Sequence, residues 1–445
     1  MTALLTLLAC KGCDEPEMLA PPPATELPDI VWVTLDTTRA DYIGAYGGGD
    51  HTPVFDGLAA RGVRFDWMLT HVPATLASHS SMFTGLDTHG HGVPSNGYEL
   101  DVSNETLAER MASLGYDPIA VIGASVLESA MGLDQGFRVY DDKLGDEKKR
   151  RYEDTADVVN QRVWAALEDR DQSRPLFLWV HYFDAHAPYE APAEWQERYA
   201  GTDYTPSWGE GPFESGDTAK YEDLTRNDMA FVRDSYRAEV AWQDHNLGEL
   251  VAGLEERGLM EALVVMADHG DLMGDPPDLR FGHASTVSFP VSRIPAFLIA
   301  PGVEPGVIER GVGSSDMVAT LLAALGLETL GTGHDLLATT QQFPVFIEAT
   351  KPKKLANKAK KAGVWNNLYK RRAVLYEDIY FVNTPSNDGE QVYAVEPVMR
   401  RTPGDKETIE AARDALNAWD EAAPPFREDK MNSATKKALE ALGYL

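Results

Sequence analysis

The chain has 445 residues, of which 43% are hydrophobic and 25% are charged, a composition typical of folded globular proteins. Its formal net charge of -30 excludes nucleic acid as a general partner, because a phosphate backbone requires a basic surface. The length suffices for one large α/β domain with a smaller one, or for two ordinary domains, and binding of an anionic substrate would require a local cation.

The first thirteen residues contain both cysteines, Cys10 and Cys13, so the rest of the chain can have no disulfide, cysteine nucleophile or thiolate metal site. The run MTALLTLLAC resembles the lipobox of bacterial lipoproteins, and a polar, proline-rich stretch typical of a tether follows. We expect residues 1–28 to be a lipoprotein-type signal and tether, and the protein to be exported to the bacterial cell envelope. A disordered N-terminus or a start site assigned too late are the alternatives, because the run is short and lacks a preceding Lys or Arg. No other segment is apolar enough to span a membrane, so we expect membrane contact only through a lipid on Cys10.

From residue 29 onward, predicted strands alternate with predicted helices. Continuous apolar runs are typical of parallel strands covered on both faces, and they occur at residues 29–37, 117–125, 174–186, 261–270 and 293–302. Helical periodicity covers residues 53–62, 103–115, 153–169, 228–257 and 315–326. This alternation predicts an α/β fold with a mostly parallel, doubly wound sheet between helices, over a domain of residues 29–340.

After residue 340 the pattern changes. Residues 351–372 are rich in Lys and Arg and contain no acid; strand-like runs follow at 372–383 and 389–398, and helices at 405–419 and about 427–442. We expect residues 341–445 to form a small α+β subdomain with an antiparallel sheet. We interpret the basic run as a solvated helix face, with contact to anionic lipid as the alternative.

Polar side chains capable of chemistry stand at the ends of the predicted strands. Asp36, Asp184 and the pair Asp268–His269 each follow a buried run, and ligands of a doubly wound sheet bind outside the carboxyl ends of its strands. Thr75 begins a helix-like run. Carboxylates, a hydroxyl and one imidazole suit a divalent metal, although each residue alone also fits a helix cap or a surface turn.

Taken together, seven short motifs resemble the sulfatase family of the alkaline phosphatase superfamily, in its order and at its spacing. They are LDTTRADYIGAYGG, PATLASHSSMFTGLDTHGHGV, FLWVHYFDAHAPY, VAWQDHNLGEL, VVMADHGDLMGD with FGHAS, SSDMVATLLAALGL and ALEALGYL. The resemblance covers nearly all of the chain from residue 29. It implies an α/β sandwich with a small C-terminal subdomain, and a metal-assisted hydrolase of sulfate or phosphate esters.

The second motif departs from the family pattern. Its head is normally a cysteine or serine that becomes formylglycine, within Cys/Ser-x-Pro-Ser-Arg, whereas this chain has Thr75 there and His79 in place of the arginine. Phosphodiesterases and phospho-group transferases of the superfamily use threonine at this position. The resemblance therefore implies that Thr75 is the nucleophile, activated by one divalent metal ion held by Asp36, Thr75, Asp268 and His269, and that phosphate mono- or diesters are favoured.

Further histidines match substrate-binding positions of the family. The resemblance implies that His79, His186 and His283 contact the anionic substrate, and that His186 and His283 take part in catalysis, with His283 protonating the leaving group. For His89 and His91 we expect a structural or second-shell role. His245 is interpreted as a packed or exposed helix residue. A second metal site at Asp184, His186 and His283 is a minor alternative.

The metal and the substrate are left open by the sequence. The family implies calcium, whereas the imidazole of His269 favours manganese or zinc. The substrate is expected to be a small anionic ester, or one linked to a glycan or lipid. The alternative functions are a sulfatase that works without formylglycine, a transferase that passes a phospho-group to another alcohol, and a non-catalytic protein that binds anionic ligands.

Overall fold

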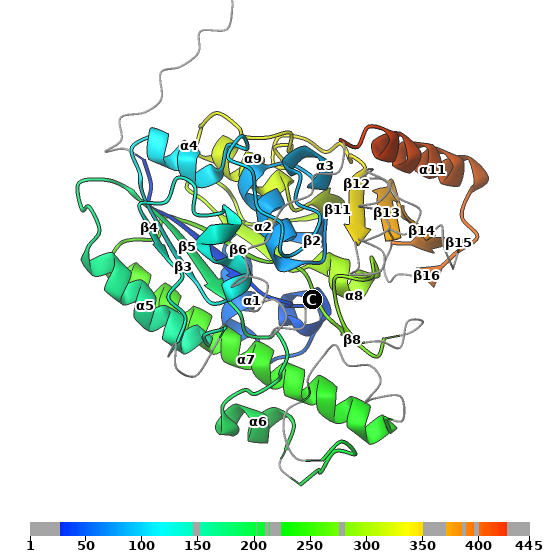
Figure 1. Ribbon diagram of the computed structural model, residues 1–445, viewed down its shortest axis with the longest axis horizontal. Coiled ribbons are helices and arrows are strands. Elements are labelled where there is room, and N and C mark those ends of the chain that lie inside the picture. The colour runs from blue at the N-terminus through cyan, green and yellow to red at the C-terminus, as the bar shows by residue number, and fades with distance from the viewer. Residues whose placement is uncertain are drawn as a thin grey trace, which may run out of the picture.

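A central sheet with helices on both faces forms the main body of the fold (Figure 1). The computed structural model describes residues 27–145, 152–201, 203–209, 213, 224–275, 281–349, 371–384, 389–395 and 400–424. Three predicted features lie outside the described residues: most of the signal and tether, the basic run at 351–370 and the helix at 427–442. None of the described helices combines the length and the apolar character that a bilayer span requires.

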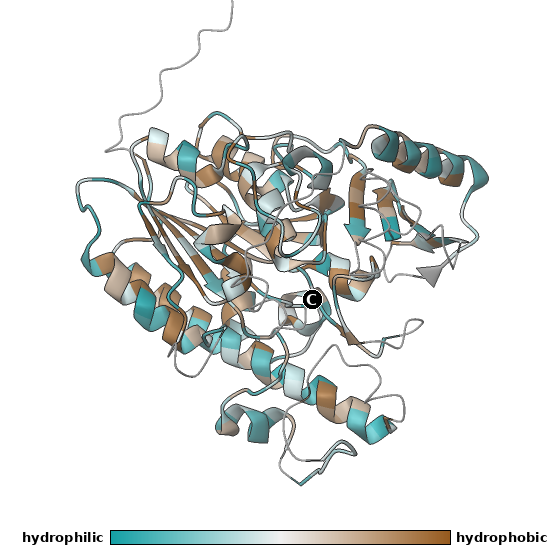
Figure 2. Cartoon of the chain, viewed as in Figure 1, coloured by the Kyte–Doolittle hydropathy of each residue, from teal (hydrophilic) through white to brown (hydrophobic). Residues whose placement is uncertain are grey.

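The central sheet consists of nine strands, of which eight form one path. In spatial order these are β11 (Gly306–Gly313), β2 (Val63–Leu69), β10 (Ala296–Ile299), β6 (Ala262–Ala267), β1 (Ile30–Leu35), β5 (Leu176–Tyr182), β3 (Asp117–Ile122) and β4 (Val139–Asp141), with β9 (Arg293–Ile294) paired to β2. Every residue of β1, β3, β5 and β6 is buried. In Figure 2 these strands are coloured mainly as hydrophobic, as expected for strands covered on both faces.

The sheet is mostly parallel, as predicted, but one predicted parallel strand runs the other way. Strand β1 is parallel to both of its neighbours, β5 and β6. The run at 293–302 instead forms β9 and β10, and β10 is antiparallel to both β6 and β2. An apolar run reports burial on both faces and carries no information on direction, which explains the error.

Two strands at one side of the sheet were not predicted. In β2, Arg64 and Asp66 interrupt the apolar pattern and pair with each other (Nε to Oδ1, 2.8 Å). Strand β11 lies at the sheet edge, where Val307 is 47% exposed. In β2 the side chains of Arg64 and Asp66 are only partly buried, and in β11 the first five residues are not buried. Neither strand therefore forms the continuous apolar run on which the prediction relied.

The helices form two layers (Figure 1). On the upper side in this view lie α2 (Thr75–Thr84), α3 (Thr88–His91), α4 (Leu107–Ser113) and α9 (Asp316–Ala324), and on the lower side α1 (Pro53–Ala59), α5 (Ala156–Glu168) and α7 (Arg226–Glu256). Helix α4 begins four residues later than the predicted 103 because Thr106 and Glu109 form a capping box. Shorter elements are α6 (Ala193–Tyr199), α8 (Phe289–Ser292), and the hairpin strands β7 (Leu272–Met273) and β8 (Phe281–Gly282).

The C-terminal part contains the predicted antiparallel sheet. Its five strands are β12 (Val345–Ala349), β13 (Arg371–Tyr376), β14 (Ile379–Thr384), β15 (Gly389–Ala394) and β16 (Arg400–Arg401), each antiparallel to the next. Helix α11 (Lys406–Glu421) packs on this sheet through Ala412 and Leu416. Trp419 of the same helix stacks on His89 with ring centres 3.6 Å apart, and its Nε1 donates to Asp87 Oδ2 (2.6 Å). These contacts join the helix to the α2–α3 region of the main body.

Candidate active site

Strand register places the two predicted carboxylates and a histidine on the same face of the central sheet. Thr34 of β1 pairs with His181 of β5, and β6 pairs with β1 on the other side. Side chains two residues apart on a strand share a face, so Asp36 lies on the face of Thr34 and His181. Asp268 directly follows β6, as Asp36 directly follows β1, and the last residues of these two strands, Leu35 and Ala267, are paired. All three side chains of His181, Asp36 and Asp268 are fully buried beneath α2.

Thr75 reaches this group from the first residue of α2. Ala74 before it is extended and makes no side-chain cap, and the helix continues to Gly85, which adopts a left-handed conformation. The Thr75 hydroxyl Oγ1 lies 3.4 Å from Asp36 Oδ2 and 3.4 Å from His269 Nε2. The structure therefore brings together the four residues predicted as metal ligands, from three separate segments of the chain.

The carboxylates of Asp36 and Asp268 are buried close to each other, and one oxygen of each is left without a hydrogen bond from a described residue. Asp268 Oδ1 accepts from the backbone N–H groups of Thr37 (3.1 Å) and His269 (2.6 Å), whereas Asp268 Oδ2 and Asp36 Oδ1 have no hydrogen-bond partner among the residues that the structure describes. Burial raises the pKa of Asp36, and the nearby histidines partly offset this increase. Burial and then the charge of Asp36 raise the pKa of Asp268 well above its usual range. Two such groups are costly in a protein interior unless a cation compensates them.

His269 presents a lone pair to these carboxylates. Its Nδ1 lies 3.0 Å from the carbonyl oxygen of Gly270, which can only accept, so Nδ1 carries the hydrogen. Its Nε2 lies 3.4 Å from Asp268 Oδ2 and 4.0 Å from Asp36 Oδ1. Burial lowers the pKa of His269 well below its usual value, so the ring is neutral and its lone pair faces two carboxylate oxygens.

This donor set fits a divalent cation. One ligand atom each from Asp36, Asp268 and His269 lies within 4.8 Å of the others. A metal would satisfy the two unpartnered carboxylate oxygens and the His269 lone pair, which otherwise repel one another, and the orienting hydrogen bond from His269 to a backbone carbonyl is typical of metal-ligating histidines. Two carboxylates, a hydroxyl and one imidazole are compatible with calcium, manganese or zinc.

His79 has no ring nitrogen to offer to a substrate. Its Nδ1 donates to the carbonyl oxygen of Thr75 (2.7 Å), and its Nε2 accepts from the Thr34 hydroxyl (3.0 Å), which in turn accepts from Trp179 Nε1 (3.0 Å). Burial lowers the pKa of His79 to about 3, so the ring is neutral. The geometry gives His79 a structural contact with the first turn of α2 in place of the predicted substrate contact.

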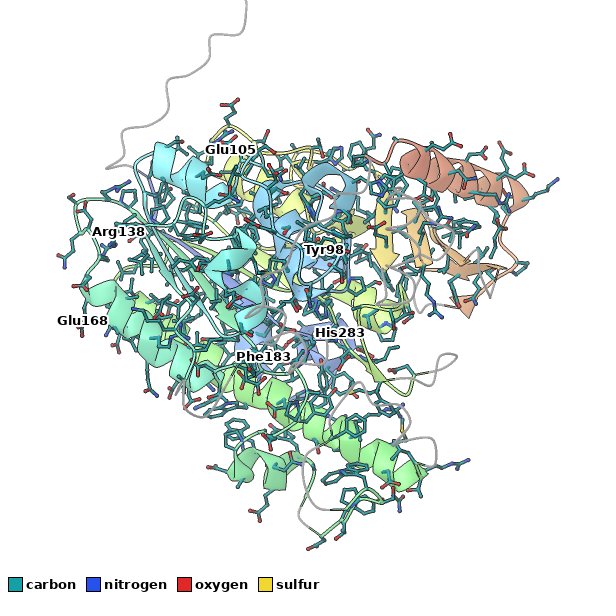
Figure 3. All side chains as sticks on the ribbon, viewed as in Figure 1. Tyr98, Glu105, Arg138, Glu168, Phe183 and His283 are labelled. Atoms are coloured by element: carbon teal, nitrogen blue, oxygen red, sulfur yellow. The ribbon has the colours of Figure 1, made fainter. Side chains whose placement is uncertain are left out.

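His186 and His283 lie beside this group, as the prediction requires. The ring of His283 is 4.3 Å from that of His269 and 5.2 Å from that of His186. Asp271 Oδ1 accepts from His283 Nδ1 (3.2 Å) and Asp271 Oδ2 accepts from the hydroxyl of Tyr189 (3.0 Å). His186 stacks on Phe183, which Figure 3 labels together with His283. Burial lowers the pKa of His186.

The minor alternative of a second metal site is not supported. Asp184 Oδ2 accepts from the backbone N–H of Ala156 (2.7 Å), and among the described residues Asp184, His186 and His283 form no cluster that could hold an ion. His91 Nε2 contacts Ser81 Oγ (2.9 Å) and so fixes α3 to α2. His245 is 45% exposed on α7.

Sequence reasoning missed two residues of the site, His181 and Asp271. His181 lies three residues before the predicted Asp184, and Asp271 lies two residues after the predicted His269. The signal for His181 was present: it is a titratable residue inside an otherwise apolar, fully buried strand, where such residues are rare unless they have a partner. Asp271 follows the pair Asp268–His269 closely, and only the fold shows that it contacts His283.

Comparison with known proteins identifies the family. Residues 28–327 match the family model described as Sulfatase. An arylsulfatase of Clostridium perfringens is 24% identical over 336 residues, covering 62% of this chain and 69% of that protein. A multifunctional alkaline phosphatase superfamily protein of Trinickia caryophylli is 24% identical, covering 68% and 74%. The solved phosphonate monoester hydrolase of Agrobacterium radiobacter has a TM-score of 0.67 at 18% identity, covering 88% and 94%. The chain belongs to the sulfatase family, whose members are sulfuric and phosphoric ester hydrolases.

Proposed function

We propose that this protein hydrolyses phosphate, phosphonate or sulfate esters with Thr75 as the nucleophile, and that it favours phosphorus esters. The observation that carries the proposal is the meeting of the Thr75 hydroxyl with a buried metal-type donor set at the carboxyl end of the sheet. The comparisons support the class of reaction, because the relatives include an arylsulfatase and a solved structure of similar fold is a phosphonate monoester hydrolase.

Asp36, Asp268, His269 and Thr75 would hold the cation. When bound, a divalent cation supplies a Lewis acid that lowers the pKa of a coordinated hydroxyl and offsets negative charge on the ester. Calcium follows from the family, and the imidazole ligand favours manganese or zinc. The three buried neutral rings nearby, of His79, His181 and His269, add no positive charge of their own.

The chain's own residues account for both halves of the reaction. Thr75 Oγ1 releases its proton to solvent and forms a bond to phosphorus or sulfur, while the ester bond to the alcohol breaks. His283, held by Asp271, is placed to give a proton to the leaving alcohol oxygen, and His186 to bind the anionic oxygens. Water then attacks the phosphorus or sulfur atom and gives a proton to His283, which restores the proton donor. The bond to Thr75 Oγ1 breaks, Oγ1 regains a proton from solvent, and the inorganic anion leaves.

A panel of three substrates with one leaving group tests the proposal. The 4-nitrophenyl esters of phosphate, phenylphosphonate and sulfate differ only in the reacting centre. We expect turnover that requires added metal, with kcat/KM for at least one phosphorus ester exceeding that for the sulfate. A formylglycine can release sulfate by elimination, whereas an ester on Thr75 has no such route. Faster sulfate hydrolysis would contradict the preference, and no turnover of any ester with calcium, manganese or zinc would contradict the function.

The location of the protein is part of the same proposal. A lipid on Cys10 would hold an exported enzyme at the cell envelope, where anionic esters linked to glycans or lipids are available as substrates. The chain also offers the phospho-group transferase as an alternative, since another alcohol in place of water would accept the group from Thr75.

A further inference from the structure

A buried histidine, His181, lies beside the proposed metal ligands and has no role in the mechanism above. It stands in β5, among Leu176–Tyr182, where every side chain is buried. Its Nε2 lies 3.4 Å from Asp36 Oδ2. Among the described residues this nitrogen has no hydrogen-bond partner of good geometry. A polar atom left in this condition in the interior indicates that it serves the neighbouring group.

The position of the hydrogen on His181 follows from its other nitrogen. The backbone N–H of Gly123 donates to His181 Nδ1 (3.4 Å). A Cβ atom at Gly123 would lie 2.9 Å from the carbonyl oxygen of His181, so only glycine permits this close approach of β5. Because Nδ1 accepts, a neutral ring must carry its hydrogen on Nε2. The N–H of Nε2 therefore faces Asp36 Oδ2.

Two polar groups therefore approach one oxygen of Asp36, one of them by a hydrogen bond from Thr75, and no described residue hydrogen-bonds to the other oxygen. The hydroxyl of Thr75 and the ring of His181 both face Oδ2, each at 3.4 Å. Oδ1 has no hydrogen-bond partner and faces His269 Nε2, 4.0 Å away. This arrangement holds the carboxylate so that Oδ1 points to the side on which Asp268 and His269 stand.

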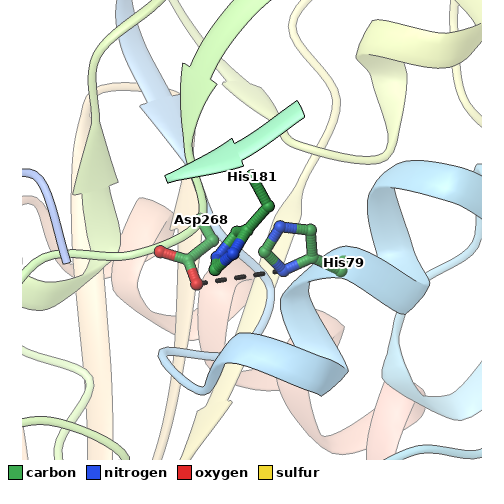
Figure 4. Close-up of side chains that lie close together, drawn as sticks. All are labelled: His79, His181 and Asp268. Carbon is green, nitrogen blue, oxygen red and sulfur yellow. Dashed lines mark ion pairs between the residues drawn. The ribbon is translucent and has the colours of Figure 1, made fainter. Parts of the chain in front are cut away.

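The neighbouring cluster of His79, His181 and Asp268, shown in Figure 4, offers a competing interpretation as a second metal site. His79 Nδ1 lies 3.9 Å from Asp268 Oδ2, but the same nitrogen donates to the carbonyl oxygen of Thr75 at 2.7 Å. A nitrogen that carries a hydrogen has no lone pair for a metal. The same reason excludes Nε2 of His181 as a ligand.

We propose that His181 is a positioning residue, whose Nε2–H orients the Asp36 carboxylate and thereby strengthens metal binding without touching the metal. The inference rests on the proposed function, because it presupposes that Asp36 is a ligand. Hydrogen bonds to metal ligands from such residues typically change metal affinity by about 10–100-fold.

Metal affinity measured by equilibrium dialysis tests the inference without any assay of turnover. In His181→Leu, which removes the donor, we expect the Kd for Mn²⁺ or Zn²⁺ to rise by about 10-fold or more. His181→Gln keeps an N–H group near the position of Nε2 and should retain most of the affinity. His91→Gln is the matched control for loss of a buried ring, because His91 contacts Ser81 and not the site, and its Kd should equal that of the wild type. An unchanged Kd in His181→Leu overturns the inference.

Two spectroscopic measurements separate positioning from ligation. In the Co²⁺-loaded protein, His181→Gln should leave the shape of the visible absorption spectrum unchanged at saturation, because no ligand is lost; a changed spectrum would make His181 a ligand and overturn the inference. If His181→Leu fails to fold, a measurement on the wild-type protein still tests the inference. Nitrogen-15 NMR of its histidines in the Zn²⁺ form should show a hydrogen on Nε2 of His181, and a hydrogen on Nδ1 would contradict the inference.

Metal binding by two variants shows whether the role of His181 or the whole proposed metal site is wrong. If wild-type protein binds no metal, or if Asp36→Ala binds it as tightly as wild type, the proposed metal site is wrong. If Asp36→Ala loses metal but His181→Leu does not, the metal site stands and only the role of His181 is wrong.

Discussion

At the scale of single residues, the chemistry of the site depends on how Thr75 is placed. Its hydroxyl lies 3.4 Å from both Asp36 Oδ2 and His269 Nε2, and a free threonine hydroxyl is a weak nucleophile. The sequence singled out this residue at the start of a helix-like run, and its role as nucleophile came from the resemblance to the sulfatase family. The carboxylates were predicted because parallel strands end at one edge of the sheet.

Replacement of Thr75 tests the covalent mechanism. We expect Thr75→Ala to reduce kcat/KM by about a thousandfold or more, as for other covalent nucleophiles. Thr75→Ser should retain part of the activity, because it keeps the oxygen but loses the methyl group that restrains the rotamer. Mass spectrometry after a rapid quench should detect a phosphorylated Thr75 in wild type. Near wild-type turnover by Thr75→Ala would instead show that water attacks directly.

Asp268 is predicted to lower the stability of the metal-free protein and to be required for metal binding. Without metal, its carboxylate is buried beside that of Asp36 with Oδ2 unpartnered. Asp268→Asn removes this repulsion, so the metal-free variant should unfold at a higher temperature than metal-free wild type. Metal at a hundredfold excess over Kd should stabilise wild type by about 2.7 kcal/mol and the variant hardly at all. Thermal unfolding with and without chelator checks both, and an equal response to metal in the two proteins would contradict the proposed ligand.

Not every residue of the site could be predicted. His181 and Asp271 act through contacts between segments distant in sequence, and no local pattern states which carboxylate a buried ring will face. His79 was assigned to substrate from its place in a motif. Its hydrogen bonds to Thr75 and Thr34 depend on α2 lying over β1, which the motif does not reveal.

At the scale of elements, prediction worked where a strand is buried on both faces. The sequence periodicity located β1, β3, β5 and β6, and the helices α5, α7 and α9, to within a few residues. It failed for β2, where two charged residues interrupt the apolar run, and for β11, whose first five residues are not buried. It also failed for the direction of β10, because burial is the same for either direction.

One helix is capped by another, and this predicts a pH dependence of stability. Helix α1 has no side-chain cap of its own, and Asp244 of α7 accepts from the backbone N–H groups of Val54 (3.0 Å) and Phe55 (2.7 Å). Burial raises the pKa of Asp244 to about 6 from 3.8. The folded state then binds the proton more tightly than the unfolded state, so this contribution to stability is full below about pH 3.8 and is lost as pH rises through about 6.

The variant Asp244→Asn isolates this effect. About two pH units at about 1.4 kcal/mol each give a loss of at most about 3 kcal/mol for wild type relative to the variant between pH 4 and pH 7. Chemical denaturation at several pH values measures it. Glu249→Gln, at an exposed position of the same helix, is the control and should follow wild type. Parallel profiles for wild type and Asp244→Asn would contradict the prediction.

At the scale of the whole molecule, helix α11 joins the C-terminal part of the chain to the main body. Trp419 of α11 contacts Asp87 and His89 in the segment that follows α2, so the C-terminal helix packs on the same layer that contains α2. The domain boundary near residue 340 stays a prediction.

The proposed anchor is tested on the full chain. If Cys10 carries a lipid, the protein expressed in bacteria should fractionate with membranes, and Cys10→Ser should move it to the soluble fraction. Cys13→Ser should behave as wild type, because only the lipobox cysteine is modified. Equal partitioning of Cys10→Ser and wild type would remove the anchor from the proposal, and would leave the active site unaffected.

All ten side chains of α2, from Thr75 to Thr84, are buried. A helix packed on every side tolerates few changes of volume, since added or removed methylenes each cost stability. Random variation selected for a new substrate should therefore spare this helix and accumulate at exposed positions that hold none of the proposed site residues. In evolutionary terms, this helix should be the slowest-changing part of the proposed site.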